Sequence, residues 1–140
     1  MNYFDIVIDT NVILSALYSR NGVSNRFLPK IDSEKFSTHI SVSLLFEYED
    51  VLFRNHSKLP YSISELSHVL NYICDVAVKH EIFYLWRPTL SDPKDDHILE
   101  LAIAGNVDYI VTYNLSDFRG IDKFGIKAIV PHDFLKLIGE

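Results

Sequence analysis

The chain has 140 residues, of which 48% are hydrophobic and 13% aromatic, enough apolar side chain to bury the core of a compact domain. Its 19 acidic and 13 basic residues give a formal net charge of −6, which excludes a protein that holds nucleic acid through bulk positive charge. One cysteine excludes an intrachain disulfide, and no apolar stretch approaches the roughly 18 residues of a membrane span.

The hydrophobic pattern alternates between strands and helices along the whole chain. It predicts helix starts at Ser41 and at the capping box formed by Ser62 and Glu65, and a helix end at Gly105. In chain order, we expect a strand at 3–8, helices at 11–19 and 23–30, a strand at 35–40, helices at 41–54 and 62–80, a strand at 81–86, a helix at 91–106, strands at 107–114 and 126–131, and a helix at 132–139.

This alternation is typical of an α/β fold with a parallel sheet between two layers of helices. No repeat, linker or low-complexity tract divides the sequence, so we expect a single domain over residues 1–140. The N-terminus has no basic, apolar leader, and the cysteine usage suits a reducing compartment. We therefore expect a cytoplasmic protein without a membrane anchor.

The first strand ends in an acid. Asp9 follows the β-branched run Ile6 to Ile8, where an unpaired buried carboxylate is costly. In open parallel sheets, ligands bind outside the carboxyl ends of the strands, where the strand order reverses. Asp9 therefore lies where a binding crevice is expected, although its alternative role is only to cap the helix that follows.

Further acids occupy comparable positions. Asp92, Asp95 and Asp96 lie at or just before the start of the predicted helix 91–106, where a carboxylate is favoured by the helix dipole. Asp117 follows the fourth strand, shortly after Thr112 and Asn114. If the first and fourth strands are neighbours, these groups converge on Asp9.

A glutamate on the predicted helix 41–54 completes the set. Glu47 and Glu49 flank opposite edges of the apolar stripe of this helix, and the helical wheel does not choose between them. Several carboxylates in one space raise one another's pKa unless a cation neutralises them. Oxygen ligands suit Mg²⁺ or Mn²⁺, and such a site indicates metal-assisted hydrolysis of a phosphodiester.

Four segments together resemble the PIN-domain ribonucleases, and among them the VapC-like toxins of toxin–antitoxin pairs. The segments are VIDTNVILSAL, EYEDVLFR, DPKDDHILELAIAGNVDYIVTYNLSDF and IVPHDFL. The resemblance implies a three-layer α/β/α sandwich with about five parallel strands, metal-dependent RNA cleavage, a homodimer and a cognate antitoxin protein as partner.

The resemblance also implies a catalytic and metal-binding set of four acids. Its helix glutamate falls on Glu47, its third acid on Asp96 with Asp95 as the near alternative, and its fourth region on TYNLSDF, where Asp117 is the candidate. Many relatives carry an aspartate where this chain has Asn114, which leaves the choice between one and two metal ions open. The full implied set is Asp9, Glu47, Asp96 and Asp117, supported by Asn11, Thr112 and Asn114 as groups that orient the carboxylates.

Basic side chains near these motifs are candidates for contacts with RNA phosphates: Arg54, Lys58 and Arg119. Trp86, Tyr113 and Phe118 are candidates for stacking on bases. Apolar residues in the segments FLPK and YSISELSHVLNYI predict a homodimer through the early helices.

Two other functions fit parts of the pattern. A phospho-acceptor receiver domain has a similar topology, but it usually carries adjacent acids after the first strand, whereas this chain has a single Asp9 before Thr10 and Asn11. A degenerate PIN-like domain that only binds a partner is the second alternative. Retention of a carboxylate in every acidic region except position 114 favours the ribonuclease.

Overall fold

A computed structural model describes residues 3–18, 26–31, 34–81 and 95–140. The strands and helices alternate as the hydrophobic pattern predicts. Their bounds are β1 Phe4–Ile8, α1 Thr10–Tyr18, β2 Phe36–Ser41, α2 Val42–Arg54, α3 Ile63–Val76, β3 Val78–His80, α4 Asp96–Ala104, β4 Tyr109–Val111, β5 Lys127–Ile129 and α5 Pro131–Leu137, with 3₁₀ turns at Leu28–Lys30, His56–Lys58, Leu115–Phe118 and Ile121–Phe124.

The five strands form one parallel sheet in the order β3-β2-β1-β4-β5. The chain first builds outward from β1 to β2 and β3, then returns to the other side of β1 to add β4 and β5. The strand order therefore reverses between β1 and β4, where Ile8 pairs with Val111. In open parallel sheets, such a reversal is where a ligand-binding site is expected, at the carboxyl ends of those two strands.

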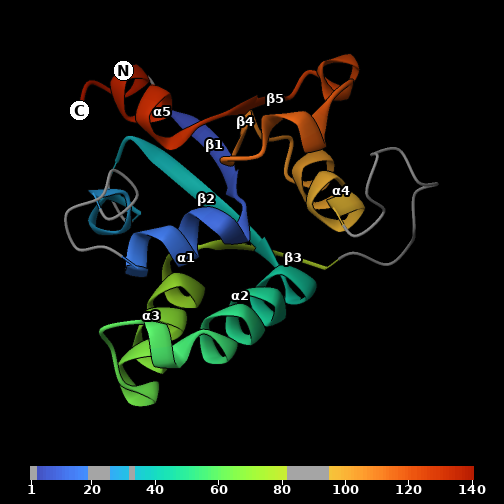
Figure 1. Cartoon of the computed structure of the whole chain (residues 1–140). Helices are drawn as coiled ribbons and strands as arrows, with labels where there is room; N and C mark the ends of the chain where they lie inside the picture. The colour runs from blue at the N-terminus through green and yellow to red at the C-terminus, as the bar shows by residue number, and fades with distance from the viewer. Residues whose placement is uncertain (1–2, 19–25, 32–33, 82–94) are drawn as a thin grey trace.

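Helices cover both faces of the sheet (Figure 1). The helices α1, α2 and α3 lie together on one side, with α2 packed against both of the others. On the other side, α4 packs against β1 and β2. The connections from β1 to β2 and from β2 to β3 step across the sheet in the same direction, so right-handed crossovers place their helices on one face. The connection from β3 back to β4 steps in the opposite direction, so it places α4 on the other face. The expected α/β architecture is confirmed.

An aromatic cluster fills the core near the amino ends of the strands. Phe134 of α5 lies with its ring centroid 5.4 Å from Phe36 and 5.6 Å from Phe27. Phe4 and Tyr109 each lie within 6.0 Å of the same ring. This aromatic packing and Asp9 therefore lie at opposite ends of the strands.

The predicted helix caps are confirmed. The Ser41 hydroxyl accepts a hydrogen bond from Leu44 N at 3.1 Å and thereby starts α2. Ser62 and Glu65 exchange the two hydrogen bonds of a capping box at the start of α3. Gly105 ends α4.

The expected helix 62–80 is wrong in its last residues. The helix α3 ends at Val76, Ala77 is extended, and Val78–His80 form β3. Ala77 is buried, and β3 pairs with β2, so tertiary packing ends the helix where the sequence has no Gly or Pro. Of the strand expected at 81–86, all residues after Glu81 lie outside the described residues. Of the helix expected at 23–30, residues 23–25 lie outside them, and the described part contains the 3₁₀ turn Leu28–Lys30.

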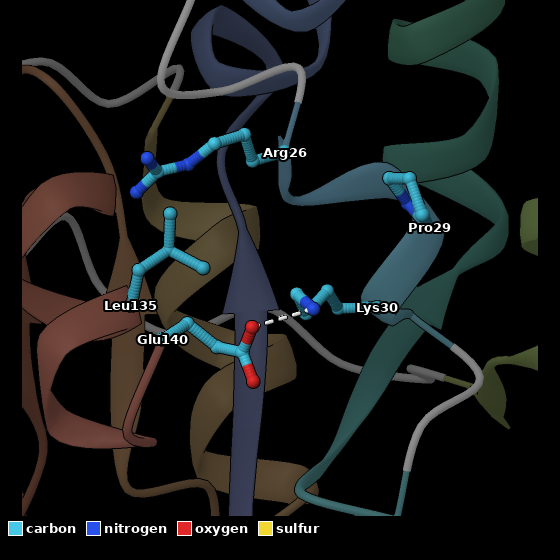
Figure 2. Close-up of a pocket in the computed structure, with 5 residues that line it drawn as sticks. All are labelled: Arg26, Pro29, Lys30, Leu135 and Glu140. Carbon is cyan, nitrogen blue, oxygen red and sulfur yellow. Dashed lines mark ion pairs between the residues drawn. The ribbon is translucent and has the colours of Figure 1, made fainter.

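The C-terminal residues are tied to the amino end of the sheet. Gly139 has a φ of 85°, and Glu140 N donates to Leu135 O at 2.8 Å, the bonding pattern of a Schellman motif. The Glu140 carboxylate pairs with Lys30 Nζ at 2.6 Å and with Lys35 Nζ at 2.7 Å. Figure 2 shows Lys30, Glu140 and Leu135 around a pocket of about 380 Å³, with Arg26 and Pro29 beside it.

None of the helices in the described part of the chain is both long enough and apolar enough to cross a bilayer.

Candidate active site

Asp9 follows β1 directly and is held by three donors. Its Oδ1 accepts from Thr10 N at 2.8 Å, and its Oδ2 accepts from Thr112 Oγ1 at 2.8 Å and from Asn11 Nδ2 at 3.2 Å. The side chain is 7% exposed. Burial raises the pKa of Asp9, the bonds from Thr112 and Thr10 oppose that rise, and the charges of Glu47 and Asp117 add to it.

The turn after β4 supplies part of this cradle. Thr112 N donates to Ile129 O at 2.9 Å, so the pairing with β5 fixes the residue that supports Asp9. The Thr112 hydroxyl also accepts from Asn114 N at 3.0 Å. Asn11 Oδ1 accepts from Tyr113 N at 3.2 Å, which ties the start of α1 to the same turn. Both ends of the reversal between β1 and β4 are thus locked around one carboxylate.

Glu47 lies on α2 next to Tyr48, which ties this helix to the end of β1. The buried Tyr48 hydroxyl donates to the carbonyl oxygen of Ile8, the last residue of β1. Thr10, which binds Asp9 through its backbone N–H, donates its hydroxyl to Glu47 Oε2. Asp9 and Glu47 are therefore linked through one intervening residue.

The environment of Glu47 shifts its pKa in the opposite direction from that of Asp9. Burial alone would raise the pKa of Glu47, but hydrogen bonds from His97 and Thr10, together with the charge of His97, lower it below its ordinary value of 4.5. The His97 Nε2 atom lies 3.0 Å from Glu47 Oε1. Two adjacent carboxylates with opposed shifts are typical of a functional site.

The two glutamates of α2 differ in their surroundings. Glu47 contacts Thr10 and His97, whereas Glu49 is exposed. The same helix places the two residues on different faces, and only one of those faces meets α1 and α4.

Asp96 is the first residue of α4, and its side chain is buried. It lies next to His97 in sequence, at the end of α4 that contacts Glu47. Asp95 occupies the N-cap position, is half-buried and makes no capping hydrogen bond to the helix. The more deeply buried acid of the pair is therefore Asp96. Asp92 lies outside the described residues.

Asp117 lies in the 3₁₀ turn Leu115–Phe118, where its N–H donates to Asn114 O at 3.0 Å. Its charge contributes to the raised pKa of Asp9, so the two carboxylates share one electrostatic environment. Asn114 is exposed and supports the site through its backbone N–H, which binds Thr112.

In a comparison with protein families, the model of the PIN domain matches residues 5–116. The matched range spans β1 to the turn after β4 and includes Asp9, Glu47 and Asp96. The chain belongs to the PIN domain family. No curated protein matches this PIN domain. PIN domains are generally nucleases, so the family supports a hydrolase.

The acids of this PIN domain suit a hard divalent cation by their chemistry. Asp9 and Glu47 are both bound by Thr10 and both offer carboxylate oxygens. Burial and the like charges of Glu47 and Asp117 disfavour the ionised form of Asp9, and a bound cation would favour it. Among the described residues, no three His, Cys, Asp or Glu side chains are already gathered closely enough to hold a metal ion. Mg²⁺ usually keeps several waters and takes one or two carboxylates, which the pair Asp9 and Glu47 provides.

The candidate RNA contacts of the PIN domain are distributed unevenly. Arg119 is exposed and follows the turn that carries Asp117. Lys58 is exposed beyond the end of α2. Arg54 forms an exposed ion pair with Asp50 at 2.9 Å. Arg54 is seven residues after Glu47, which is roughly 10 Å along the helix. Of these three basic residues, Arg119 lies nearest in sequence to an acid of the set, two positions after Asp117.

Of the aromatic candidates, Tyr113 is 42% exposed at the rim of the site. The expectation that Phe118 stacks on a base is wrong, because it is 2% exposed and belongs to the core. Trp86 lies outside the described residues.

Sequence reasoning missed two residues of the site, Thr10 and His97. Thr10 follows Asp9 directly, and from the first turn of α1 its hydroxyl donates to Glu47. A search of helix starts for capping side chains would have drawn attention to this hydroxyl. His97 contacts Glu47 across fifty positions in sequence, and the sequence has no pattern that indicates this pair.

Proposed function

We propose that this PIN domain is an endoribonuclease that depends on Mg²⁺ or Mn²⁺ and hydrolyses phosphodiester bonds in RNA. The observation that carries the proposal is the cradle of Asp9: a buried carboxylate at the sheet's reversal point, fixed by three donors and adjacent to a second carboxylate. Burying an ionised carboxylate costs free energy of folding, and an oriented carboxylate is a ligand that a hard divalent cation prefers.

In this proposal Asp9 and Glu47 would hold the cation, and Asp96 and Asp117 are the further acids of the proposed set. When bound, it supplies charge neutralisation for the scissile phosphate and lowers the pKa of a coordinated water. The Thr112 hydroxyl and the Asn11 amide keep the carboxylate of Asp9 oriented, because both donate to its Oδ2. The Thr10 hydroxyl and His97 do the same for Glu47.

The substrate proposal is single-stranded or looped RNA. An acidic crevice repels the phosphates of a stiff duplex, whereas an unpaired strand can present one phosphate to it. Arg119 beside the acids, with Lys58 and Arg54 further away, is the proposed contact for flanking phosphates. Tyr113 at the rim offers an exposed ring for a base.

The test is cleavage of a panel of structured RNAs by the purified protein with Mg²⁺ or Mn²⁺. We expect products that disappear with EDTA and with Asp9→Asn, and that persist with the exposed control Asp133→Asn. Absence of cleavage across the panel, in a protein that is folded, would contradict the nuclease and favour the degenerate, partner-binding alternative. That alternative draws support from Asn114, a neutral amide where an acid would strengthen the site.

A toxin role, with a homodimer and an antitoxin partner, is a further part of the proposal. It rests on the order of motifs and on exposed apolar side chains, among them Ile63 on α3 at 44% and Phe46 on α2 at 63%. Phe27 of the segment FLPK does not contribute, since it lies in the aromatic core. Light scattering at high micromolar concentration tests the dimer, and a monomer there would contradict it. Growth arrest on expression, relieved by the product of an adjacent gene, tests the toxin role.

A further inference from the structure

The carboxylate of Glu47 is held by a separate donor on each oxygen. His97 Nε2 lies 3.0 Å from Oε1, and the Thr10 hydroxyl donates to Oε2. These donors belong to α4 and α1, while Glu47 belongs to α2. Three helices from both faces of the sheet therefore meet at one carboxylate, and its orientation depends on all of them.

The contact with His97 is more than a surface ion pair. The side chains of His97 and Glu47 are 28% and 33% exposed, so the pair is partly withdrawn from solvent. The other ring nitrogen, His97 Nδ1, is buried and has no hydrogen-bond partner among the described residues. A buried polar atom without a hydrogen bond costs free energy. The orientation of the ring therefore satisfies Nε2 through Glu47 and leaves Nδ1 without a hydrogen bond in the described part of the chain.

We propose that His97 is a positioning residue for the metal site. It acts through Glu47: its Nε2–H fixes Oε1 while Thr10 fixes Oε2, and Thr10 binds Asp9 through its backbone N–H at 2.8 Å. The chain His97–Glu47–Thr10–Asp9 thereby sets the spacing of two acids. This inference rests on the proposed function, because it assigns His97 a role in the affinity of that site for a divalent cation.

Among the described residues, loss of the His97 donor leaves Thr10 as the donor to the Glu47 carboxylate. Partners that orient metal-binding side chains typically account for a factor of about 10 to 100 in metal affinity. We therefore expect a variant without the donor to bind Mn²⁺ about 10- to 100-fold more weakly. In cleavage assays the loss should appear in kcat at a given Mn²⁺ concentration and leave the KM for RNA nearly unchanged, because His97 orients an acid rather than the substrate.

A matched pair of variants isolates the donor. His97→Gln keeps an amide N–H at a similar reach, whereas His97→Met has nearly the same shape and no donor. His132→Met is the control, because His132 is an exposed histidine on α5 that pairs with Asp133 and not with an acid of the site. Thermal melts without metal identify the folded variants, and isothermal titration calorimetry with Mn²⁺ gives the dissociation constants.

The expected result is weak Mn²⁺ binding for His97→Met and near wild-type binding for His97→Gln and His132→Met. Equal Mn²⁺ affinity of the wild type and folded His97→Met would overturn the positioning role and leave the nuclease proposal intact. Equal weakening in folded Gln and Met variants would also overturn it, because the donor would then not be the cause. Absence of Mn²⁺ binding in the wild type would overturn the proposed function itself, and the role of His97 with it.

Discussion

The imidazole of His39 is hydrogen-bonded to the imidazole of His80, with Nδ1 of the first 2.7 Å from Nε2 of the second. The other nitrogen of His39 lies 2.9 Å from Asp5 Oδ1. This chain of three side chains joins β1, β2 and β3 on the face that α4 covers. Of the two facing nitrogens, one must donate and the other accept, so protonation of both rings would break the bond.

The first prediction concerns acid. Burial, and then the neighbouring charge of His39, lowers the pKa of His80 below its ordinary value of 6.5. A group with a depressed pKa stabilises the fold fully above its unfolded value and loses that contribution as the pH falls through the folded value. We expect stability to fall on acidification from pH 7, and His80→Gln to reduce that fall. Chemical denaturation across pH 5 to 7.5 measures it, with exposed His132→Gln as control; equal slopes in all three proteins would refute the assignment.

The second prediction concerns Gly105, which ends α4 against the same two rings. A Cβ at this position would lie 2.8 Å from His39 Nδ1 and 3.2 Å from His80 Nε2. The backbone φ of −84° suits any residue, so the effect of a substitution comes from this contact. We expect Gly105→Ala to lower the free energy of unfolding by about 1 to 3 kcal/mol, the usual cost of overpacking. Urea denaturation measures it, and a stabilised variant would show that the imidazoles move aside.

The third prediction separates a metal-binding acid from a structural cap. The pKa of Asp9 is raised in the fold, so the ionised side chain destabilises the metal-free protein. The contribution of Asp9 to the free energy of unfolding is favourable below its ordinary pKa of 3.8 and is lost as the pH rises through its pKa in the folded protein. We expect Asp9→Asn to abolish cleavage and to leave the metal-free protein at pH 7 as stable as the wild type or slightly more so. Thermal melts in EDTA decide this, and a loss of several kcal/mol would identify Asp9 as a cap.

Addition of metal should reverse the ranking of those two proteins. At about a hundredfold excess over its dissociation constant, Mn²⁺ should stabilise the wild type by roughly 2.7 kcal/mol. For a chain of this length, that is a rise in Tm on the order of 10 °C. The gain should shrink sharply in Asp9→Asn and should fade at acidic pH, where protons compete for the carboxylates.

The fourth prediction concerns Tyr48, which fixes α2 to the end of β1. Burial, with the charges of Asp9 and Glu47, raises the pKa of the Tyr48 hydroxyl well above 10, so the hydroxyl stays protonated and donates to Ile8 O. Tyr48→Phe leaves that buried carbonyl without its donor, and we expect a loss of about 1 to 3 kcal/mol in unfolding free energy. Cleavage should fall too, because Glu47 adjoins Tyr48. Full stability of the variant would show that the carbonyl finds another donor.

The fifth prediction concerns the C-terminal ion pairs. Lys30 and Lys35 lower the pKa of Glu140 to about 2, from an ordinary value of 4.5. Its contribution to stability is present above pH 4.5 and is lost as the pH falls toward about 2. We expect Glu140→Gln to flatten the acid dependence in this window, measured by denaturation against exposed Asp133→Asn. High salt should have the same effect, because these charges are close to solvent.

Much of the fold was predictable from local patterns. The β-branched run before Asp9 predicted β1, and the capping residues Ser41 and Ser62 predicted where α2 and α3 begin. The end of α3 was not predictable, because Val78 continues an apolar pattern without a Gly or Pro. Its conversion to a strand depends on pairing with β2, which is distant in sequence.

The site divides in the same way. The position of Asp9 followed from strand pattern and topology alone, since every strand of a parallel sheet ends at the same edge. The choice of Glu47 over Glu49 depends on which face of α2 meets α1 and α4, and no local pattern encodes that. His97 depends on the same long-range packing, so its contact with Glu47 was found only in the structure.

The central position of the first strand has a consequence for biosynthesis. The hydroxyl that completes the cradle of Asp9 belongs to Thr112, 103 residues later in the chain. At translation rates of about 5 to 20 residues per second, that delay is about 5 to 20 s. During this interval a nascent chain carries β1 without its neighbour β4. The cradle of Asp9 can therefore be completed only after the ribosome has added Thr112, long after it has added Asp9.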